Sequence, residues 1–157
     1  MLTLHASCVA RNGLAVLLRG ASGSGKSDLA FRMIDAGARL VADDCTRLSR
    51  DDTRLIAGAP ETIRGLLEIR GLGPVELLPA APTPLALVID LVPRTSVPRL
   101  PEPRFETFLG IALPCLSLDA FTASAAAVAL LALERAAAGR LFEPAEARGL
   151  RRRGAAQ

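Results

Sequence analysis

Short apolar runs separated by turn residues mark the N-terminal part of the chain and predict strands there. Residues 2–10 alternate loosely between apolar and polar positions, which predicts one strand. Residues 11–13 are typical of a hairpin turn, and the apolar residues 14–18 predict a second, buried strand. Beyond a glycine-rich stretch, residues 27–36 have the pattern of a helix that stops at Gly37.

Similar signals continue along the rest of the chain. Residues 85–91 are an apolar run with one aspartate near its end, typical of a buried strand. Residues 93–103 contain four prolines and no periodicity, which predicts a surface loop. A helix is expected from a cap at Thr122 or Ser124 to about residue 138. Further strands are predicted at residues 39–42, at 45–49 and 53–57 as a hairpin, at 75–78, and at 104–118 as two or three pieces broken at Gly110 and Pro114.

The length and composition fit one domain over residues 1–157 that is long enough to bury a sizeable core. The chain has no Trp or Tyr and only five Phe, so the core is expected to be aliphatic. We find no internal repeat and no linker that would divide the chain. Beyond residue 144 the sequence becomes polar, which predicts a C-terminal tail with a frayed helix.

Composition also limits the cellular compartment and the classes of partner that we expect. The three cysteines are widely separated and form no C-x-x-C pair, which argues against a disulfide framework or a zinc site and favours the cytoplasm. The longest apolar stretch, residues 123–133, is too short to span a membrane, and the N-terminus lacks a signal peptide pattern. The net charge of +3 includes the arginines at 151–153, but no basic stripe is interleaved with aromatics. We therefore expect no membrane and no nucleic acid as a partner.

The glycine-rich stretch at residues 20–27 fits the P-loop pattern G-x-x-x-x-G-K-[ST] at every fixed position. It lies between a predicted strand and a predicted helix, where backbone N–H groups and the helix dipole favour a phosphate group. Lys26 is the only lysine among the 19 basic residues, which indicates a position where arginine does not substitute. The candidate ATP-binding residues are Gly20, Ala21, Ser22, Gly23, Ser24, Gly25, Lys26 and Ser27.

Carboxylates follow two of the predicted strands. Asp43 and Asp44 come directly after residues 39–42, where they could hold Mg²⁺ or accept a proton from an attacking hydroxyl. Asp90, near the end of a buried strand, competes for the metal role, and the pattern alone does not separate the two positions. His5 is a lone histidine on the first predicted strand, and such a residue is more often packed or on the surface than catalytic.

Three motifs in order resemble the catalytic domain of HPr kinase/phosphorylase. They are the glycine-rich segment at residues 20–28, Leu-Val-Ala-Asp-Asp at 40–44, and Leu-Glu-Ile-Arg-Gly-Leu-Gly at 67–73. The resemblance covers about residues 2–135. It implies an α/β fold related to phosphoenolpyruvate carboxykinase, a P-loop architecture with a mixed sheet and flanking helices. It also implies ATP-dependent phosphorylation of a serine on HPr, the phosphocarrier of the sugar phosphotransferase system, by a homo-oligomer that is a hexamer in the family.

The resemblance assigns a role to each matching residue. Lys26 and the loop amides would hold the nucleotide phosphates, and Ser27 and Glu68 would bind Mg²⁺. Asp43 would act as the base toward the serine hydroxyl, and as the acid in the reverse, phosphorolytic direction. His5 would assist nearby. In this reading Asp90 is only a residue at a strand end.

The chain departs from the family in two places. Full-length members carry an additional N-terminal domain, so the chain resembles the short form found in some proteobacteria. Where the family has a basic Pro-Gly-Arg-Asn loop before its later helix, residues 118–124 contain no arginine. Inorganic phosphate needs several donors to compete with water, so a working kinase with weak phosphorolysis is expected. The alternative is that an arginine from elsewhere, such as Arg70, Arg94 or one of a neighbouring subunit, takes the missing place.

Two other functions fit the same motifs. A small-molecule kinase on this scaffold would have an enclosed polar pocket beside Asp43. A nucleotide-sensing module without catalysis would bind ATP, but turnover would not depend on Asp43.

Overall fold

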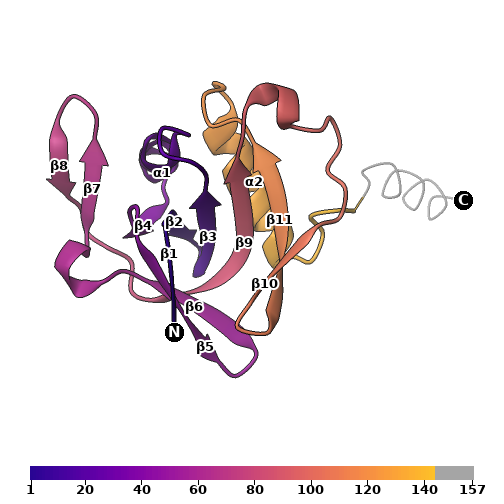
Figure 1. Ribbon diagram of the computed structural model, residues 1–157, viewed down its shortest axis with the longest axis horizontal. Coiled ribbons are helices and arrows are strands. Elements are labelled where there is room, and N and C mark those ends of the chain that lie inside the picture. The colour runs from indigo at the N-terminus through magenta and orange to yellow at the C-terminus, as the bar shows by residue number, and fades with distance from the viewer. Residues whose placement is uncertain (144–157) are drawn as a thin grey trace, which may run out of the picture.

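Among residues 1–143, which this computed structural model describes, nine strands form one curled sheet and two more form a separate hairpin. The sheet runs in the order β1-β5-β6-β9-β3-β2-β4, with β11 paired to β9 and β10 paired to β11. Helices α1 and α2 pack together against one face (Figure 1). The elements are β1 (Leu2–Leu4), β2 (Ala6–Arg11), β3 (Leu14–Arg19), α1 (Lys26–Asp35), β4 (Arg39–Ala42), β5 (Thr46–Asp51), β6 (Arg54–Gly58), η1 (Glu61–Ile63), β7 (Leu66–Ile69), β8 (Gly73–Glu76), β9 (Thr83–Leu91), η2 (Arg94–Ser96), β10 (Phe105–Phe108), β11 (Ile111–Leu118) and α2 (Ala125–Ala137).

The central strand β3 is buried on both faces, which explains why its sequence is apolar without alternation. Val16 and Leu18 belong to an apolar layer shared with the two helices. Ala15 and Leu17 belong to a second layer, which the curled sheet encloses between β2, β3 and β9 on one side and β5, β6, β10 and β11 on the other. Leu, Val, Ile and Ala make up most of both layers, as the composition predicts.

The direction of the strands changes at β3. This strand is antiparallel to β2 but parallel to β9, and β9 is parallel to β11. The carboxyl ends of β3, β9 and β11 therefore share one edge, where the loops that lead into α1 and α2 also lie (Figure 1). Ligands of open α/β sheets bind at such an edge, next to the point where the order of the strands reverses.

The expected single strand at residues 2–10 is wrong, because the chain bends at His5. Residues 2–4 form β1 on β5, and the register then changes so that β2 lies between β3 and β4. Thr46 Oγ1 donates a hydrogen bond of 2.8 Å to the Ala6 carbonyl beside the bend. Because of this bend, residues 2–11 pair with β5 at one end and with β3 and β4 at the other. The alternation of polar and apolar residues does not reveal such a change of partner.

The expected break at Gly110 is confirmed, but the break at Pro114 is wrong, since β11 continues through it. Pro114 pairs with Phe105 of β10, and the next residue, Cys115, donates its backbone N–H toward that side at 2.9 Å. Successive amides of a strand point to opposite sides, so the proline nitrogen faces β9. Pairing with β9 begins only at Cys115, and the missing N–H therefore removes no ladder hydrogen bond.

Both predicted helices are confirmed to within two residues at each end. Ser124 is the N-cap residue of α2, although its side chain makes no capping hydrogen bond. The strand expected at 75–78 is β8, two residues earlier, and the proline-rich residues 93–103 contain only the short η2. The expected tail from residue 144 and the arginines at 151–153 lie outside the described residues.

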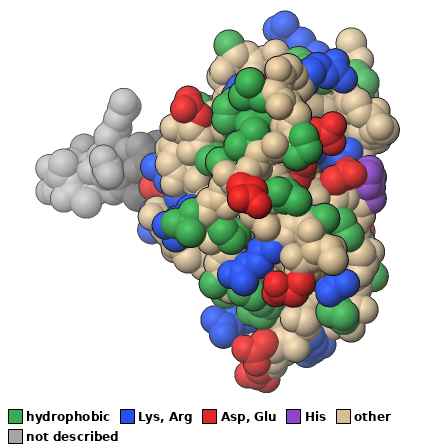
Figure 2. Space-filling view, turned by 90° about the vertical axis from the view of Figure 1, so that its left-hand side faces the viewer, with side chains coloured by type: hydrophobic (Ala, Val, Ile, Leu, Met, Phe, Trp, Pro, Cys, Tyr) green, Lys and Arg blue, Asp and Glu red, His purple; other side chains and the backbone are tan. Residues whose placement is uncertain are grey.

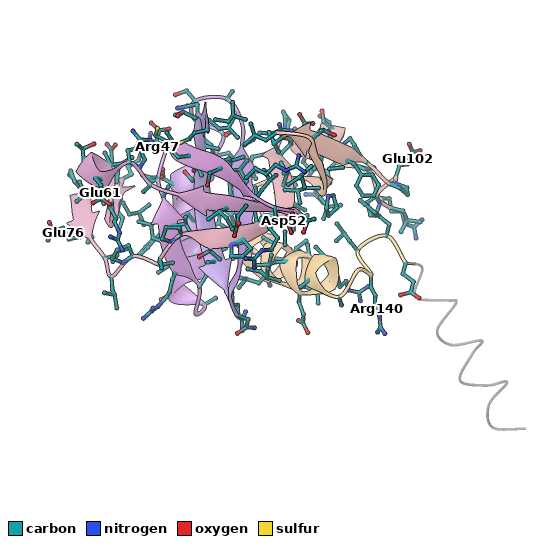
Figure 3. All side chains as sticks on the ribbon, turned by 90° about the horizontal axis from the view of Figure 1, so that it is seen from below. Arg47, Asp52, Glu61, Glu76, Glu102 and Arg140 are labelled. Carbon is teal, nitrogen blue, oxygen red and sulfur yellow. The ribbon has the colours of Figure 1, made fainter. Side chains whose placement is uncertain are left out.

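Charged side chains project from the outer edges of the described structure, as Glu61, Glu76, Glu102 and Arg140 do in Figure 3. In residues 1–143, neither helix has the length and the apolar character needed to cross a membrane.

Candidate active site

The glycine-rich loop (residues 20–25) connects β3 to α1 and is built so tightly that two of its glycines are required. A Cβ on Gly20 would lie 2.3 Å from Ser24 Oγ. Gly25 is the N-cap of α1 with a φ of 95°, and a Cβ there would lie 2.8 Å from the Ala120 Cβ. The first helical hydrogen bond, from the Leu29 N–H to the Gly25 carbonyl, measures 2.9 Å. The loop thus places the N-terminus of α1 at the shared edge of β3, β9 and β11.

Lys26 is buried and folds back over the glycine-rich loop. Its Nζ donates hydrogen bonds to the carbonyls of Gly20 and Ala21 at 2.8 and 3.1 Å. Within residues 1–143, Ser24 Oγ is the one buried side-chain oxygen without a hydrogen-bond partner. A cation held by neutral carbonyls and an orphaned hydroxyl in the same loop fit a phosphate group, which would supply acceptors to both.

Asp43 is the carboxylate that the fold brings to this loop. It follows β4, is only 8% exposed, and receives three hydrogen bonds. Ser27 Oγ and Ser7 Oγ donate to its Oδ1 at 2.7 and 2.8 Å, and the Glu68 backbone N–H donates to its Oδ2 at 3.2 Å. The first turn of α1, strand β2 and strand β7 therefore all meet at this one side chain.

Ser7 is a site residue that sequence reasoning missed. Its hydroxyl is fully buried, donates to Asp43 and accepts the Asp44 backbone N–H at 3.2 Å. This one side chain therefore orients Asp43 and fixes the turn after it. The only signal in the sequence is a hydroxyl within an otherwise apolar strand, which is too common to mark a site.

His5 pairs with Asp44 on the surface of the protein and makes no hydrogen bond to Asp43 among the described residues. His5 Nδ1 lies 3.3 Å from Asp44 Oδ1, and the two side chains are 60% and 66% exposed. Asp44 has a φ of 62°, the left-handed conformation that turns the chain out of β4. Figure 2 shows the histidine on the surface beside acidic side chains. The structure thus places His5 beside Asp44, the residue that follows Asp43.

Glu68 reaches Asp43 with its backbone, while its side chain is on the exposed face of β7. The neighbouring Leu67 is completely buried and anchors the β7–β8 hairpin. Arg70 is exposed at the turn of that hairpin. The structure therefore brings Ser27 and Asp43 together through their side chains and adds Glu68 through its main chain. The Lys26 side chain contacts the glycine-rich loop instead.

Asp90 belongs to a different cluster. Arg19 Nε and Nη2 donate to its two carboxylate oxygens at 2.7 and 3.2 Å, and Arg104 Nη2 lies 3.2 Å from Oδ2. The Cys115 thiol donates to the same Oδ2 at 3.3 Å. Asp90, the alternative to Asp43 for the metal role, therefore has both of its carboxylate oxygens bound by the two arginines and the thiol.

The ionisation of this cluster follows from its contacts. Burial alone would raise the pKa of Asp90, but the hydrogen bond and charge of Arg19, the Cys115 thiol and the charge of Arg104 together hold that pKa below its ordinary value. Burial, followed by the nearby Asp90 charge, raises the pKa of Cys115 to about 11, so its thiol keeps the proton that it donates. Asp90 thus serves as the charged centre of a structural network.

Residues 1–80 match the family model described as the HPr Serine kinase C-terminal domain. The chain belongs to this family. The matched segment contains every residue that the sequence singled out for catalysis, nucleotide binding or metal binding, from His5 to Glu68, whereas Asp90 lies beyond it.

Relatives and a solved structure agree with this membership. An HPr kinase/phosphorylase of Geobacillus thermodenitrificans is 44% identical over 96 residues, which cover 56% of this chain and 31% of that relative. The HPr kinase/phosphorylase of Bacillus subtilis is 45% identical over 76 residues, or 48% of this chain and 24% of the relative. The chain therefore spans less than a third of the length of these curated relatives.

The structure of the Hpr(Ser) kinase/phosphatase from Coxiella burnetii has a TM-score of 0.75 and 27% sequence identity to this chain. The similarity covers 86% of this chain and 89% of that one. It confirms the expected mixed α/β fold, with a curled sheet and two helices.

In this family member, Ser7→Ala is expected to lower the free energy of unfolding by about 1–3 kcal/mol, because the buried Asp43 carboxylate loses a donor and the Asp44 N–H loses its acceptor. Urea denaturation measures the change. The exposed Ser49 on β5 gives a matched control, for which Ser49→Ala should stay within about 0.5 kcal/mol of the wild type. Equal effects of the two substitutions would show that Ser7 does not support Asp43.

Asp90→Asn is expected to lower the free energy of unfolding by about 1.5–3 kcal/mol, since Arg19 and Arg104 lose the charge that they share. The pKa of Asp90 is lower in the folded than in the unfolded chain, so its contribution is fully present above an unfolded pKa of about 3.9 and disappears as pH falls through the folded pKa.

Unfolding curves at neutral pH and at progressively lower pH, measured for wild type and Asp90→Asn, test this expectation. The two free energies should converge as the pH falls through the folded pKa. Asp51→Asn removes the carboxylate of an exposed pair with Arg54 at 3.4 Å, and serves as the control with an effect below about 1 kcal/mol. A constant difference between wild type and Asp90→Asn at every pH would contradict the assignment.

Proposed function

We propose that the chain is an ATP-dependent protein kinase that phosphorylates a serine of an HPr-like phosphocarrier protein and thereby regulates carbon metabolism. One observation carries the proposal: the 2.7 Å hydrogen bond between Ser27 Oγ and Asp43 Oδ1 joins the glycine-rich loop to a buried carboxylate. The names of the relatives, HPr kinase/phosphorylase, support the same activity and the same protein substrate. The resemblance further supports a P-loop domain of the phosphoenolpyruvate carboxykinase-like type and a cytoplasmic homo-hexamer.

In this proposal the glycine-rich loop is a P-loop that binds the triphosphate of ATP. The loop amides and Lys26 Nζ bind the β- and γ-phosphates, for which Nζ exchanges its present carbonyl partners. The α1 N-terminus contributes its partial positive charge. Ser24 Oγ, which is buried and unpartnered in residues 1–143, gains a phosphate oxygen as its acceptor.

The oxygen atoms around Asp43 also fit Mg²⁺, which prefers one or two protein ligands with the remaining positions filled by phosphate and water. Residues 1–143 contain no group of three or more acidic, His or Cys side chains at metal-binding distance, which is compatible with that sparse set of protein ligands. Ser27 Oγ and the Glu68 carboxylate, which is on the exposed face of β7, would hold the ion. A bound Mg²⁺ would neutralise charge on the phosphate oxygens.

Asp43 acts as the base in the proposed reaction. Among residues 1–143, its Oδ2 accepts only the Glu68 N–H, so a lone pair is free to take the proton of the carrier serine. The serine oxygen forms a bond to the γ-phosphorus while the bond to the oxygen bridging it to the β-phosphorus breaks, and ADP leaves. Ser7 and Ser27 hold the carboxylate in place, which is a positioning contribution. His5 would assist from the exposed His5–Asp44 pair next to Asp43.

The proposal covers the forward reaction. Residues 118–124 contain no arginine to hold inorganic phosphate for phosphorolysis, and Arg70 and Arg94 are exposed on a hairpin turn and on η2. Phosphorolysis at a rate comparable with forward transfer is therefore not part of the proposed activity.

Incubation with ATP·Mg²⁺ and candidate HPr proteins, with the phosphorylated site mapped by mass spectrometry, tests the proposed function. We expect one phosphoryl group on one serine of the carrier. Consumption of ATP with phosphate appearing on an added metabolite would favour the small-molecule kinase instead. Binding of ATP without turnover would favour the nucleotide-sensing module.

A further inference from the structure

An exposed aromatic ring lies directly beside the glycine-rich loop. Phe121, in the loop between β11 and α2, is 67% exposed. Its Cζ would be 3.2 Å from a Cβ on Gly25, so the edge of the ring lies against the glycine at the start of α1. In a chain with five phenylalanines and no Trp or Tyr, leaving such a ring in water costs free energy unless a ligand covers it.

The backbone that carries Phe121 is held in place from several sides. Arg32 of α1 donates hydrogen bonds to the carbonyls of Ala120 and Thr122, and its guanidinium is oriented by Asp28 at 2.8 Å. Ala120 is almost fully buried against Gly25. The Phe121 N–H donates to Asp119 Oδ1 at 3.0 Å. Each flanking residue is thus fixed by packing or hydrogen bonds, and the ring is presented to solvent from a preorganised loop.

The position of this ring relative to Asp43 indicates what it contacts. Asp43 follows β4, on one side of β3 in the sheet, whereas Phe121 follows β11, on the other side, beyond β9. A triphosphate bound along the glycine-rich loop with its γ-phosphate beside Asp43 must direct its nucleoside away from β4. That direction leads toward the carboxyl ends of β9 and β11 and the loop that carries Phe121 (Figure 1).

The chemistry of the surroundings favours a base over another phosphate or a charged group. The phenylalanine ring offers a π-face and no hydrogen-bonding atom. The nearby Asp119 carboxylate already accepts the Phe121 N–H, and Arg32 is already engaged with Asp28 and two carbonyls. A flat, apolar purine is the part of a nucleotide that such a surface accommodates.

We propose that Phe121 stacks against the purine base of the nucleotide whose phosphates the glycine-rich loop binds. The inference rests on the proposed function, because it requires a nucleotide in that loop. Stacking on a ring without donors or acceptors does not distinguish one purine from another, so Phe121 contributes equally to the binding of ATP and GTP.

Calorimetric titration of the whole chain with three probes tests the inference: ATP, GTP and tripolyphosphate, each with Mg²⁺. Phe121→Ala should weaken ATP and GTP about tenfold and leave tripolyphosphate unchanged, since only the nucleotides carry a base. Phe105→Ala is the matched control, because Phe105 is 58% exposed and its ring contacts Phe142 instead of the loop. This control should leave all three affinities unchanged.

A second variant gives an independent readout. The chain has no tryptophan, so in Phe121→Trp the new indole is the only one and its fluorescence reports on this position alone. ATP should change the emission, whereas tripolyphosphate should not, and the affinity for ATP should be retained.

The inference is overturned if wild type binds ATP and Phe121→Ala binds it equally well; the proposed nucleotide site then still stands. If Phe121→Ala keeps its ATP affinity but raises the KM for the carrier, the ring contacts the protein substrate and the inference is also wrong. If wild type binds neither ATP nor tripolyphosphate, the proposed function fails together with the inference.

Discussion

Replacing Lys26 with methionine is expected to slow phosphoryl transfer by about a hundredfold to a thousandfold while the protein remains folded. The proposed function places Nζ against the charge that develops on the transferred group, and methionine has similar length but no charge. The folded state loses only the hydrogen bonds from Nζ to the carbonyls of Gly20 and Ala21. The loss should therefore appear in the rate of transfer and only weakly in stability.

The measurement is the transfer rate per folded molecule, with folding checked by thermal unfolding of the same samples. Arg39→Met removes an exposed cation at the start of β4 and is the matched control, which should transfer at the wild-type rate. Lys26→Arg should not restore the activity, because a planar guanidinium does not fit the space of a compact ammonium. Normal transfer by a folded Lys26→Met protein would remove the basis for a P-loop at residues 20–27.

Asp43→Asn is expected to reduce transfer by about a hundredfold to ten-thousandfold, while the affinity for ATP·Mg²⁺ changes much less. The amide oxygen can still accept from Ser27 and Ser7, so the loop keeps its shape. The amide nitrogen, however, is a donor facing the Glu68 N–H, and it cannot take a proton from the carrier serine. The substitution thus separates nucleotide binding from proton transfer.

Nucleotide titration and single-turnover transfer, measured on the same variant, distinguish the two effects. Asp90→Asn is the matched control, because it removes a carboxylate whose partners are Arg19, Arg104 and Cys115. It should be less stable but should transfer normally once folded. A larger loss of transfer in Asp90→Asn than in Asp43→Asn would mean that Asp90 is the base.

Local features of the sequence predict the elements that carry the candidate site. The apolar run of β3, the glycine spacing and the following helix are all encoded within residues 14–37, so their prediction needs no distant contact. Asp43 can also be predicted locally, because it directly follows a short strand. The order and spacing of the three motifs indicate the family.

Contacts between distant residues could not be predicted in this way. Arg19 and Asp90 are 71 positions apart, and either alone resembles a solvated charge. Pro114 lies in a strand because its nitrogen faces a side where pairing has not yet begun, which depends on the register with β9. The bend at His5 depends on the curl of the sheet, and the exposure of Phe121 depends on Arg32 holding the loop of a distant strand.

In the proposed function, the site transfers the γ-phosphoryl group of ATP to a serine of a carrier protein. The most direct test is a single-turnover experiment in which radiolabelled ATP is bound to the wild-type chain and HPr is then added. We expect one burst of label on the carrier, and none on a carrier whose acceptor serine is replaced by alanine. Release of the label as free phosphate, at the same rate with and without the carrier, would contradict it.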